Sequence, residues 1–417
     1  MFKSRIFILT FILISIKCDF AINLDTSLIY NTSIAVKDSK TVTFDTSIQP
    51  GKIIDEMGFG WNLGNSFDAN NKKSGDEGLV SETSWGNPKT TEKMITKLVQ
   101  KGFKSIRIPV SWHNHIIDQK YTIDPKWMER VKKVVDICLQ KGLYVIINVH
   151  HDQAEKDIAY GYGYYPLNQF KEESEKFLLN IWTQITVAFN NGYDHHLLFE
   201  TLNEPRLRGD SDNEWVYNPG NADAEECIQV INEYNNLIHS VIRKSGGNNK
   251  VRFLLYTNGA AGFNFVTSDR FVLPEDTSYN NNTDNKRILV SVHMYSPYFF
   301  ASNGDMTYNN FNMDYINELE NSFHILKNKF VDNGHYVIIT EMGASDKMNT
   351  DQRIAWGTFF VKRSRQLGMA CVVWDNKRWN NDYDGDEKYG LYHRDKLTFE
   401  PDSLVDAFIN AAKTPIG

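Results

Sequence analysis

The sequence predicts an α/β fold, namely a single-domain (β/α)8 TIM barrel. Eight apolar runs alternate with segments of helical periodicity, which is typical of parallel strands that are covered by helices. Each apolar run ends in polar or aromatic residues, as expected where the strands of a barrel meet solvent at their carboxyl ends. The length of 417 residues suits one barrel with loop insertions, and a two-domain chain is the alternative.

Short local signals mark the ends of several helices. Pro125 after Asp124 is typical of a helix N-terminus, and Gly102 and Gly142 are typical of helix C-termini. Another helix is predicted to start at Asn87-Pro88 and to end at Gly102. The predicted strands occupy residues 57–69, 104–112, 142–152, 197–206, 251–262, 287–297, 335–344 and 369–376. The later helices are predicted around residues 177–185 and at 224–243, 314–332, 350–366 and 404–413.

The amino-terminal segment is predicted to be a secretory signal. Lys3 and Arg5 precede the apolar run 6–16, which is too short to cross a bilayer core of roughly 30 Å. The mature protein is therefore expected to be secreted into the extracellular space, and a retained membrane anchor is the alternative. The predicted organisation is a signal at residues 1–21, an extended lead-in at 22–50 and the barrel domain at 51–417.

The cysteines do not suggest a cross-linked scaffold. Cys138, Cys227 and Cys371 show no spacing typical of a disulfide framework or of a zinc site, so they are predicted to be small core residues. Asn31 and Asn281 begin acceptor sequons for N-glycosylation, which have meaning only in a eukaryotic secretory host.

Charge excludes one class of partner. The formal net charge of −7 and the isoelectric point near 5.9 argue against nucleic acid, because phosphate backbones are bound by clustered lysines and arginines. A neutral substrate suits this composition better. A monomer is expected, without membrane attachment once the signal is removed.

Two glutamates follow apolar strands and are the first candidates for acid/base chemistry. Glu204 ends the run 197–206, and Glu341 ends the run 335–344. Taken alone, Glu204 is equally well explained as a carboxylate that caps a loop through backbone hydrogen bonds. Two carboxylates at the ends of different strands of one barrel can face each other across a bond, which is the arrangement that glycoside hydrolysis requires.

The other strand ends add polar and aromatic side chains that converge on the same face of a barrel. They are Asn65, Arg107, His150, His151, Asn203, His293, Tyr295 and Trp374. The ordered motifs resemble glycoside hydrolase family 5, most closely its endoglucanase-rich subfamily 4, from residue 57 to the end of the chain. The motifs that carry this resemblance are GWNLGNS, IRIPVSW, VHH, LNEPR, VHMYSP, TEMGA and VVWDN.

The resemblance implies a role for each of the two carboxylates. Glu204 would be the acid/base, and Glu341 the nucleophile of a retaining mechanism, in which the acid is protonated and the nucleophile ionised. Arg107 would keep Glu341 charged, Tyr295 would orient it, and His293 would influence the protonation of Glu204.

The resemblance also implies a set of sugar-binding residues. Asn203 would bind the 2-hydroxyl of the sugar that is cleaved, His150 and His151 would bind other hydroxyls, and Trp374 would stack beneath the sugar. Asn65 completes the set at the first strand end. Trp215 and Trp379, in polar loop-like stretches, are also predicted to bind sugars.

Three structural alternatives accompany these assignments. Arg107 could be a structural ion-pair partner, and Glu200 is expected to face the barrel interior or a structural partner. The adjacent histidines suggest a metal, but side chains alternate along a strand and no third ligand is evident in the sequence. The acidic loop 382–387 lacks the spacing of a calcium loop and is predicted to be a solvated turn. We expect no bound metal and no cofactor.

The predicted function is therefore that of a secreted, retaining endo-β-1,4-glucanase whose substrate is a β-glucan. The same mechanism on xyloglucan, mixed-linkage glucan, xylan or mannan is the nearest alternative, because small loop differences decide which hydroxyls are contacted. A non-catalytic carbohydrate-binding barrel is a more remote one. Intracellular barrel isomerases of phosphorylated sugars are disfavoured by the signal and by the lack of a late glycine-rich phosphate loop.

Overall fold

The computed structural model describes residues 40–71, 76–154, 163–276, 287–380 and 385–417. By its internal contacts the chain divides into two compact units, Met1–Ile34 and Ala35–Gly417, and every described residue belongs to the second. The predicted signal at 1–21, both sequons and residues 382–384 of the acidic loop lie outside the described residues.

Eight parallel strands close into one barrel in the order of the sequence, which confirms the predicted fold class. The strands are β1 (Phe59–Asn62), β2 (Ser105–Ile108), β3 (Tyr144–Asn148), β4 (Leu197–Glu200), β5 (Leu254–Tyr256), β6 (Ile288–Met294), β7 (Val337–Met342) and β8 (Met369–Val373). They are shorter than the apolar runs that predict them, because the polar carboxyl end of each run turns away as a loop above the barrel.

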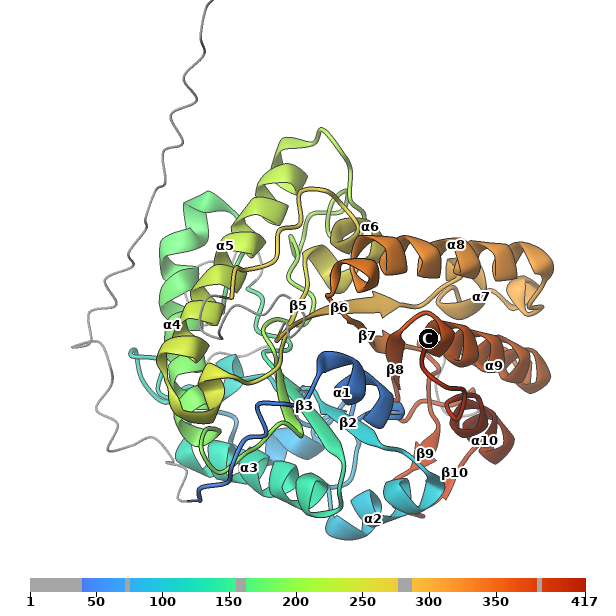
Figure 1. Cartoon of the computed structure of the whole chain (residues 1–417), viewed down its shortest axis with the longest axis horizontal. Coiled ribbons are helices and arrows are strands. Elements are labelled where there is room, and N and C mark those ends of the chain that lie inside the picture. The colour runs from blue at the N-terminus through green and yellow to red at the C-terminus, as the bar shows by residue number, and fades with distance from the viewer. Residues whose placement is uncertain (1–39, 72–75, 155–162, 277–286, 381–384) are drawn as a thin grey trace, which may run out of the picture. The chain divides into compact units, whose positions relative to one another are not determined.

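Helices surround the strands in Figure 1. The long ones are α2 (Glu92–Lys101), α3 (Pro125–Gln140), α4 (Lys171–Ala188), α5 (Ala222–Lys244), α8 (Met313–Lys329), α9 (Thr350–Gln366) and α10 (Asp402–Ala411). Short helices are α1 (Pro50–Glu56), α6 (Phe263–Val266) and α7 (Tyr298–Ala301), and the hairpin β9 (Tyr392–His393) with β10 (Thr398–Phe399) precedes α10. None of the helices in the described part of the chain has the length and apolarity that a membrane span requires.

Helix α2 begins later than predicted, and its capping residue explains why. Thr91 is the N-cap, and its hydroxyl accepts a hydrogen bond from the Met94 amide at 3.4 Å. Asn87 instead donates its side-chain amide to the Asn65 carbonyl, 2.7 Å away, and so ties two loops together. Helix α3 begins as predicted, with the Asp124 carboxylate accepting from the Lys126 amide.

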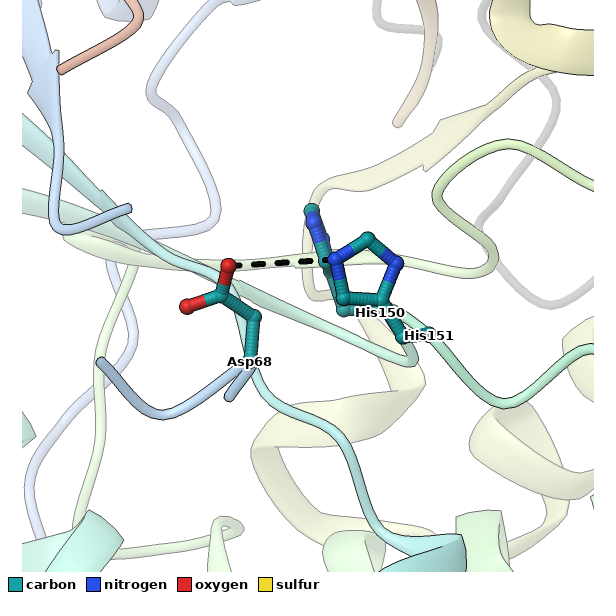
Figure 2. Close-up of side chains that lie close together, drawn as sticks. All are labelled: Asp68, His150 and His151. Atoms are coloured by element: carbon teal, nitrogen blue, oxygen red, sulfur yellow. Dashed lines mark ion pairs between the residues drawn. The ribbon is translucent and has the colours of Figure 1, made fainter. Parts of the chain in front are cut away.

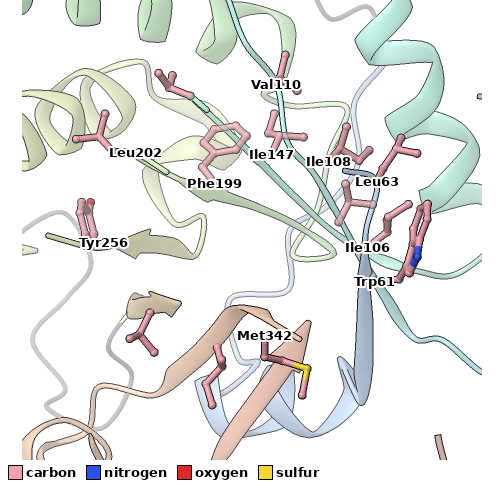
Figure 3. Close-up of a cluster of buried hydrophobic side chains, with 14 of the residues drawn as sticks. Trp61, Leu63, Ile106, Ile108, Val110, Ile147, Phe199, Leu202, Tyr256 and Met342 are labelled. Atoms are coloured by element: carbon pink, nitrogen blue, oxygen red, sulfur yellow. The ribbon is translucent and has the colours of Figure 1, made fainter. Parts of the chain in front are cut away.

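The alternation of side chains along each strand separates two apolar layers. One layer lies between strands and helices, and Figure 3 shows part of it, including Ile147 and Phe199. The other fills the amino-terminal half of the barrel interior, with Ile146 and Leu198 from the intervening positions. Helix α1 overlies the strands in Figure 1, and its Ile53 belongs to this inner layer, so α1 closes the barrel at that end.

Candidate active site

The carboxyl-terminal half of the barrel interior is polar, and Arg107 lies at its centre. The guanidinium donates to Glu200 at 2.8 Å, to Asn62 at 2.9 Å, to Glu341 at 2.7 Å and to Asn203 at 2.6 Å. The side chains of Arg107 and Glu200 are fully buried. Arg107 thus pairs with a structural carboxylate, as its alternative assignment proposed, and also contacts the predicted nucleophile. Glu200 faces the interior as expected.

The two candidate carboxylates face each other as predicted. Oxygens of Glu204 and Glu341 and a ring nitrogen of His293 all lie within 4.8 Å of one another. His293 Nδ1 is 2.8 Å from Glu204 Oε1 and 3.5 Å from Glu341 Oε2. The Tyr295 hydroxyl donates to Glu341 Oε2 at 2.7 Å. Hydrogen bonds and an ion-pair contact thus connect these four side chains at the carboxyl ends of β4, β6 and β7.

An irregularity in β7 turns Glu341 into this group. Strict alternation from Ile338 would place Thr340 inward and Glu341 outward. The pairing of β6 with β7 slips by one residue after Val292, so that His293 pairs with Glu341. A bulge of this kind re-aims the side chains that follow it. Thr340 remains inside, where its hydroxyl bonds Ser291 at 2.6 Å.

Electrostatics in the ligand-free site differ from the expected order. Burial raises the pKa of Glu204, but the hydrogen bond and charge of His293, with the charge of Arg206, outweigh it and hold that pKa at about 2. Burial raises the pKa of Glu341 above its usual 4.5 despite the opposing charges of His293 and Arg107. Although burial lowers the pKa of His293, the charges of Glu341 and Glu204 raise it overall. The raised pKa of His293 favours a proton on this ring, between the two carboxylates.

Hydrogen bonds fix the orientation of His150. The side-chain oxygen Oδ1 of Asn148 accepts a hydrogen bond from the Val110 backbone amide at 3.1 Å. The side-chain nitrogen Nδ2 of Asn148 therefore faces His150 Nδ1, also at 3.1 Å. Nδ1 must accept this bond, which leaves the ring proton on Nε2 as a donor. The ring of Trp374 is parallel to that of His150, with 6.0 Å between ring centroids. His150 and Trp374 thus lie together, as predicted.

Asp68 is a neighbour of the two histidines that the sequence did not reveal. Figure 2 shows Asp68, His150 and His151, whose potential ligand atoms lie within 4.8 Å of one another. The Asp68 oxygens already accept from the backbone amides of Asn65 at 3.0 Å and Ser66 at 2.7 Å, while His151 Nε2 is 3.9 Å away. Burial raises the pKa of Asp68 to about 6. Its contacts give Asp68 a clear role in holding the loop after β1.

Burial keeps both histidines neutral, which suits hydrogen bonding to hydroxyl groups. It lowers the pKa of His150 well below 6.5 and that of His151 to about 3. With its Nε2 protonated, His150 offers a donor rather than a metal-binding lone pair at that nitrogen.

The structure corrects the prediction for Trp379. Its side chain is only 6% exposed, its ring stacks on His393 at 3.9 Å, and its indole N–H donates to the Glu400 carbonyl. The face that stacks on His393 is closed to a sugar, and the side chain as a whole is buried. The polar residues around Trp379 suggested exposure, but the β9–β10 hairpin that covers it is a contact from a later segment.

Two other tryptophans lie nearer the site. Trp215 is 57% exposed and stacks on the guanidinium of Arg206, 4.1 Å from the ring centroid. Arg206 also lies 3.4 Å from a Glu204 oxygen, so Trp215 is placed beside the pair. The ring centroid of Trp85 lies 5.7 Å from that of His151. Asn65 is at the same rim, with its amide donating to the Asn376 carbonyl.

Comparison with known proteins confirms the resemblance seen in the motifs. The profile of the family described as "Cellulase (glycosyl hydrolase family 5)" matches residues 67–380. Endoglucanase A of Ruminococcus albus is 36% identical over 367 residues, which cover 87% of this chain and 92% of that protein. Endoglucanase A of Clostridium longisporum is 37% identical over 370 residues, again 87% of this chain.

This chain spans 66% of the length of the C. longisporum protein and 40% of that of the Acetivibrio thermocellus cellulase/esterase CelE, which is 38% identical. Among solved structures, a GH5-4 broad specificity endoglucanase from Ruminococcus champanellensis with bound cellotriose superposes with a TM-score of 0.78. It is 36% identical, and the match covers 88% of this chain and all of that one. On the barrel, the ordered strand ends and these matches, the chain belongs to glycosyl hydrolase family 5.

Proposed function

We propose that this protein is a secreted, retaining endo-β-1,4-glucanase that cleaves internal bonds of β-glucan chains. The observation that carries the proposal is the facing pair, Glu204 and Glu341, with carboxylate oxygens within 4.8 Å. Retaining glycosidases hold their carboxyl groups about 5 to 5.5 Å apart, whereas inverting ones need about 6.5 to 9.5 Å to admit a water. The close approach of the two carboxylates supports the retaining arrangement.

In the first step the Glu341 carboxylate attacks the anomeric carbon, and Glu204 protonates the leaving oxygen. Arg107 and Tyr295 each contact one oxygen of Glu341, at 2.7 Å, and so aim the nucleophile. In this proposal the proton comes from His293, whose pKa is raised and whose Nδ1 is hydrogen-bonded to Glu204 at 2.8 Å. Transfer along that bond makes Glu204 the acid when substrate excludes water from the site.

In the second step Glu204, now ionised, takes a proton from water, which attacks the glycosyl–Glu341 ester and releases the sugar with its configuration retained. Asn203 accepts from Arg107 through its oxygen, which leaves its amide NH2 group as the donor for the sugar 2-hydroxyl. That contact strengthens as positive charge develops on the sugar.

Mixed-linkage glucan and xyloglucan are the strongest alternative substrates. Similar solved structures include a GH5 family lichenase from Caldicellulosiruptor sp. F32, 35% identical with a TM-score of 0.80. They also include a family 5 xyloglucanase from Paenibacillus pabuli, 30% identical with a TM-score of 0.75. Because the chemistry is shared, the preferred backbone depends on contacts outside the catalytic pair.

The test is release of reducing ends from carboxymethylcellulose, mixed-linkage glucan, xyloglucan, xylan and mannan side by side. We expect the two unbranched glucans to be cleaved fastest, with β-configured new ends by NMR. Glu341→Gln should lose more than about 10³-fold in kcat, as removal of a nucleophile does, without losing its fold by circular dichroism. Dominant activity on xyloglucan, xylan or mannan would overturn the substrate, and α-configured new ends would overturn the mechanism.

Secretion has its own test. The apolar run 6–16 after Lys3 and Arg5 supports export with removal of the first residues. Amino-terminal sequencing of protein from the culture medium of an expressing host should begin near residue 22. Protein retained in the membrane with Met1 intact would contradict this proposal.

A further inference from the structure

A group of exposed aromatic side chains lies on the segment that follows β6. Tyr298, Phe299 and Tyr308 are 60%, 47% and 37% exposed. Ring centroids are 5.5 Å apart for Tyr298 and Phe299 and 4.6 Å apart for Phe299 and Tyr308, so the three rings form one surface. We call these three residues the outer aromatic surface. Contiguous exposed apolar groups of this kind often mark binding sites.

The backbone beneath this surface is held firmly by the loop after β7. Lys347, which is 1% exposed, donates its ammonium to the carbonyls of Phe299 at 2.6 Å, Phe300 at 2.9 Å and Tyr308 at 3.2 Å. Its charge also complements the carbonyl end of α7. The Ser345 amide donates to the last carbonyl of the same helix at 2.9 Å. Because the backbone that carries the rings is already ordered, a ligand that binds them loses less entropy than one that must order this segment.

The same two loops leave the catalytic group. Tyr298 follows Tyr295 by three residues, so their Cα atoms are at most about 11 Å apart. Ser345 follows Glu341 by four residues. The outer aromatic surface is therefore attached directly to the two strands that carry His293, Tyr295 and the nucleophile.

Barrel order indicates which half of the substrate this surface faces. The proposed contacts of the attacked sugar, His150 and Trp374, follow β3 and β8, whereas β6 lies opposite β2 in a ring of eight strands. Glu204, which protonates the leaving oxygen, is bonded to His293 of β6. The outer aromatic surface thus belongs to the side of the leaving chain.

Acidic groups border the surface. Asp305 is exposed and lies between Phe299 and Tyr308 in the chain. The Asp386 carboxylate packs against Gly304, so closely that a Cβ atom on residue 304 would lie 1.9 Å from it. The neighbouring Glu387 is exposed, and the charges of Glu204 and Glu341, after burial, raise its pKa. Carboxylates accept hydrogen bonds from hydroxyl groups and repel anions, so this border favours a neutral polyhydroxyl ligand.

We propose that the outer aromatic surface binds a distal glucosyl residue of the leaving chain, stacking on its C–H face. This inference rests on the proposed endoglucanase function and adds a specificity site to it. Sugar rings pack on aromatic planes for the same reason that aromatic residues pair with apolar groups, and tyrosine hydroxyls add hydrogen bonds at the edge. The site makes long unbranched chains better substrates than short ones.

The experiment compares two substrates of the full chain. Cellohexaose places sugars on the leaving side, whereas β-cellobiosyl fluoride has only fluoride there. For Tyr298→Ala/Phe299→Ala, the ratio of kcat/KM on cellohexaose to kcat/KM on the fluoride should fall about tenfold. Tyr298→Ala alone should give a smaller fall, and Tyr298→Phe less still. Val272→Ala, at a valine that is 58% exposed before the β6 strand, is the matched control and should leave the ratio unchanged.

The outcomes separate the two proposals. An unchanged ratio in the double variant, with an active wild type, overturns the outer aromatic surface as a sugar site and leaves the function standing. A fall on both substrates alike also overturns it, because it shows a general loss rather than a loss on the leaving side. Wild-type protein that is inactive on both substrates and on every glucan overturns the proposed function itself, and this inference with it.

Discussion

At the amino-terminal ends of the strands the barrel interior is aliphatic, whereas two residues further along the same strands it is charged and amidic. Leu198 of β4 is followed inward by Glu200, and Ile146 of β3 by Asn148. In β7 Ile338 is followed by Thr340. One set of strands thus carries two opposite environments within a few ångströms, each set by the residues at alternate positions.

The two halves depend on different physics. The lower half, at the amino-terminal ends of the strands, gains stability from apolar burial, which is non-directional and tolerates small changes in shape. The upper half buries Arg107 with Glu200 and Glu341, and such charges are tolerated only when each is paired and hydrogen-bonded. We therefore expect the lower half to tolerate the loss of a side chain without loss of activity. In the upper half, removal of one partner leaves an uncompensated charge buried in the barrel.

The largest expected effect comes from removing the central cation. Arg107→Met leaves Glu200 and Glu341 buried without their partner, which should lower the free energy of unfolding by about 3 to 5 kcal/mol at pH 7. Urea unfolding followed by fluorescence measures it. Arg107→Met/Glu200→Gln, which removes one orphaned charge, should recover part of the loss. A single variant as stable as the wild type would show that the upper half is not held by this pairing.

A deletion in the lower half should separate stability from activity. Leu255 is fully buried in the inner apolar layer, so Leu255→Ala should cost about 2 to 5 kcal/mol of unfolding free energy by leaving a cavity. At temperatures where the variant stays folded, kcat on mixed-linkage glucan should match the wild type. A kcat that falls in parallel with stability would break the proposed independence of the two halves.

The pH profile tests where the upper half keeps its proton. Glu341 must be ionised to attack, and its raised pKa puts the acid limb above 4.5. His293 must hold the proton that Glu204 delivers, so activity falls as pH rises through the His293 pKa, which is raised above 6.5. Both limbs appear in kcat/KM measured from pH 3 to 10. His293→Gln should remove the alkaline limb set by the ring, and a limb that stays in place would assign it to another group.

The smallest effect is expected at the rim, where a side chain belongs to neither half. Trp215→Ala removes an exposed ring stacked on Arg206, a contact worth about 0.5 to 1 kcal/mol at such sites. KM for cellohexaose should rise a few-fold with little change in melting temperature. Trp379→Ala removes a buried ring that stacks on His393, so this variant should instead lower the melting temperature. The reverse pattern would restore Trp379 as the sugar contact and remove Trp215.

The sequence by itself determined the barrel and the inventory of its carboxyl-terminal rim. Apolar runs that alternate with amphipathic segments are a local signal, and the polar residue at each strand end is read directly from position. This is why Glu204, Glu341, His293 and Tyr295 could be grouped before any coordinates. The same period of two could also have found Asn148, two residues before His150, as an inward-facing partner.

Only the tertiary structure decided which neighbours those residues meet. The bulge that turns Glu341 inward depends on pairing between β6 and β7, which local propensity does not encode. Trp379 is covered by a hairpin that follows it, and Asp68 approaches His151 from the loop after β1. The pKa of His293, which burial lowers, is likewise raised overall by the charges of Glu341 and Glu204. Period and polarity act between near neighbours in the chain, whereas burial and electrostatic fields depend on segments that only folding brings together.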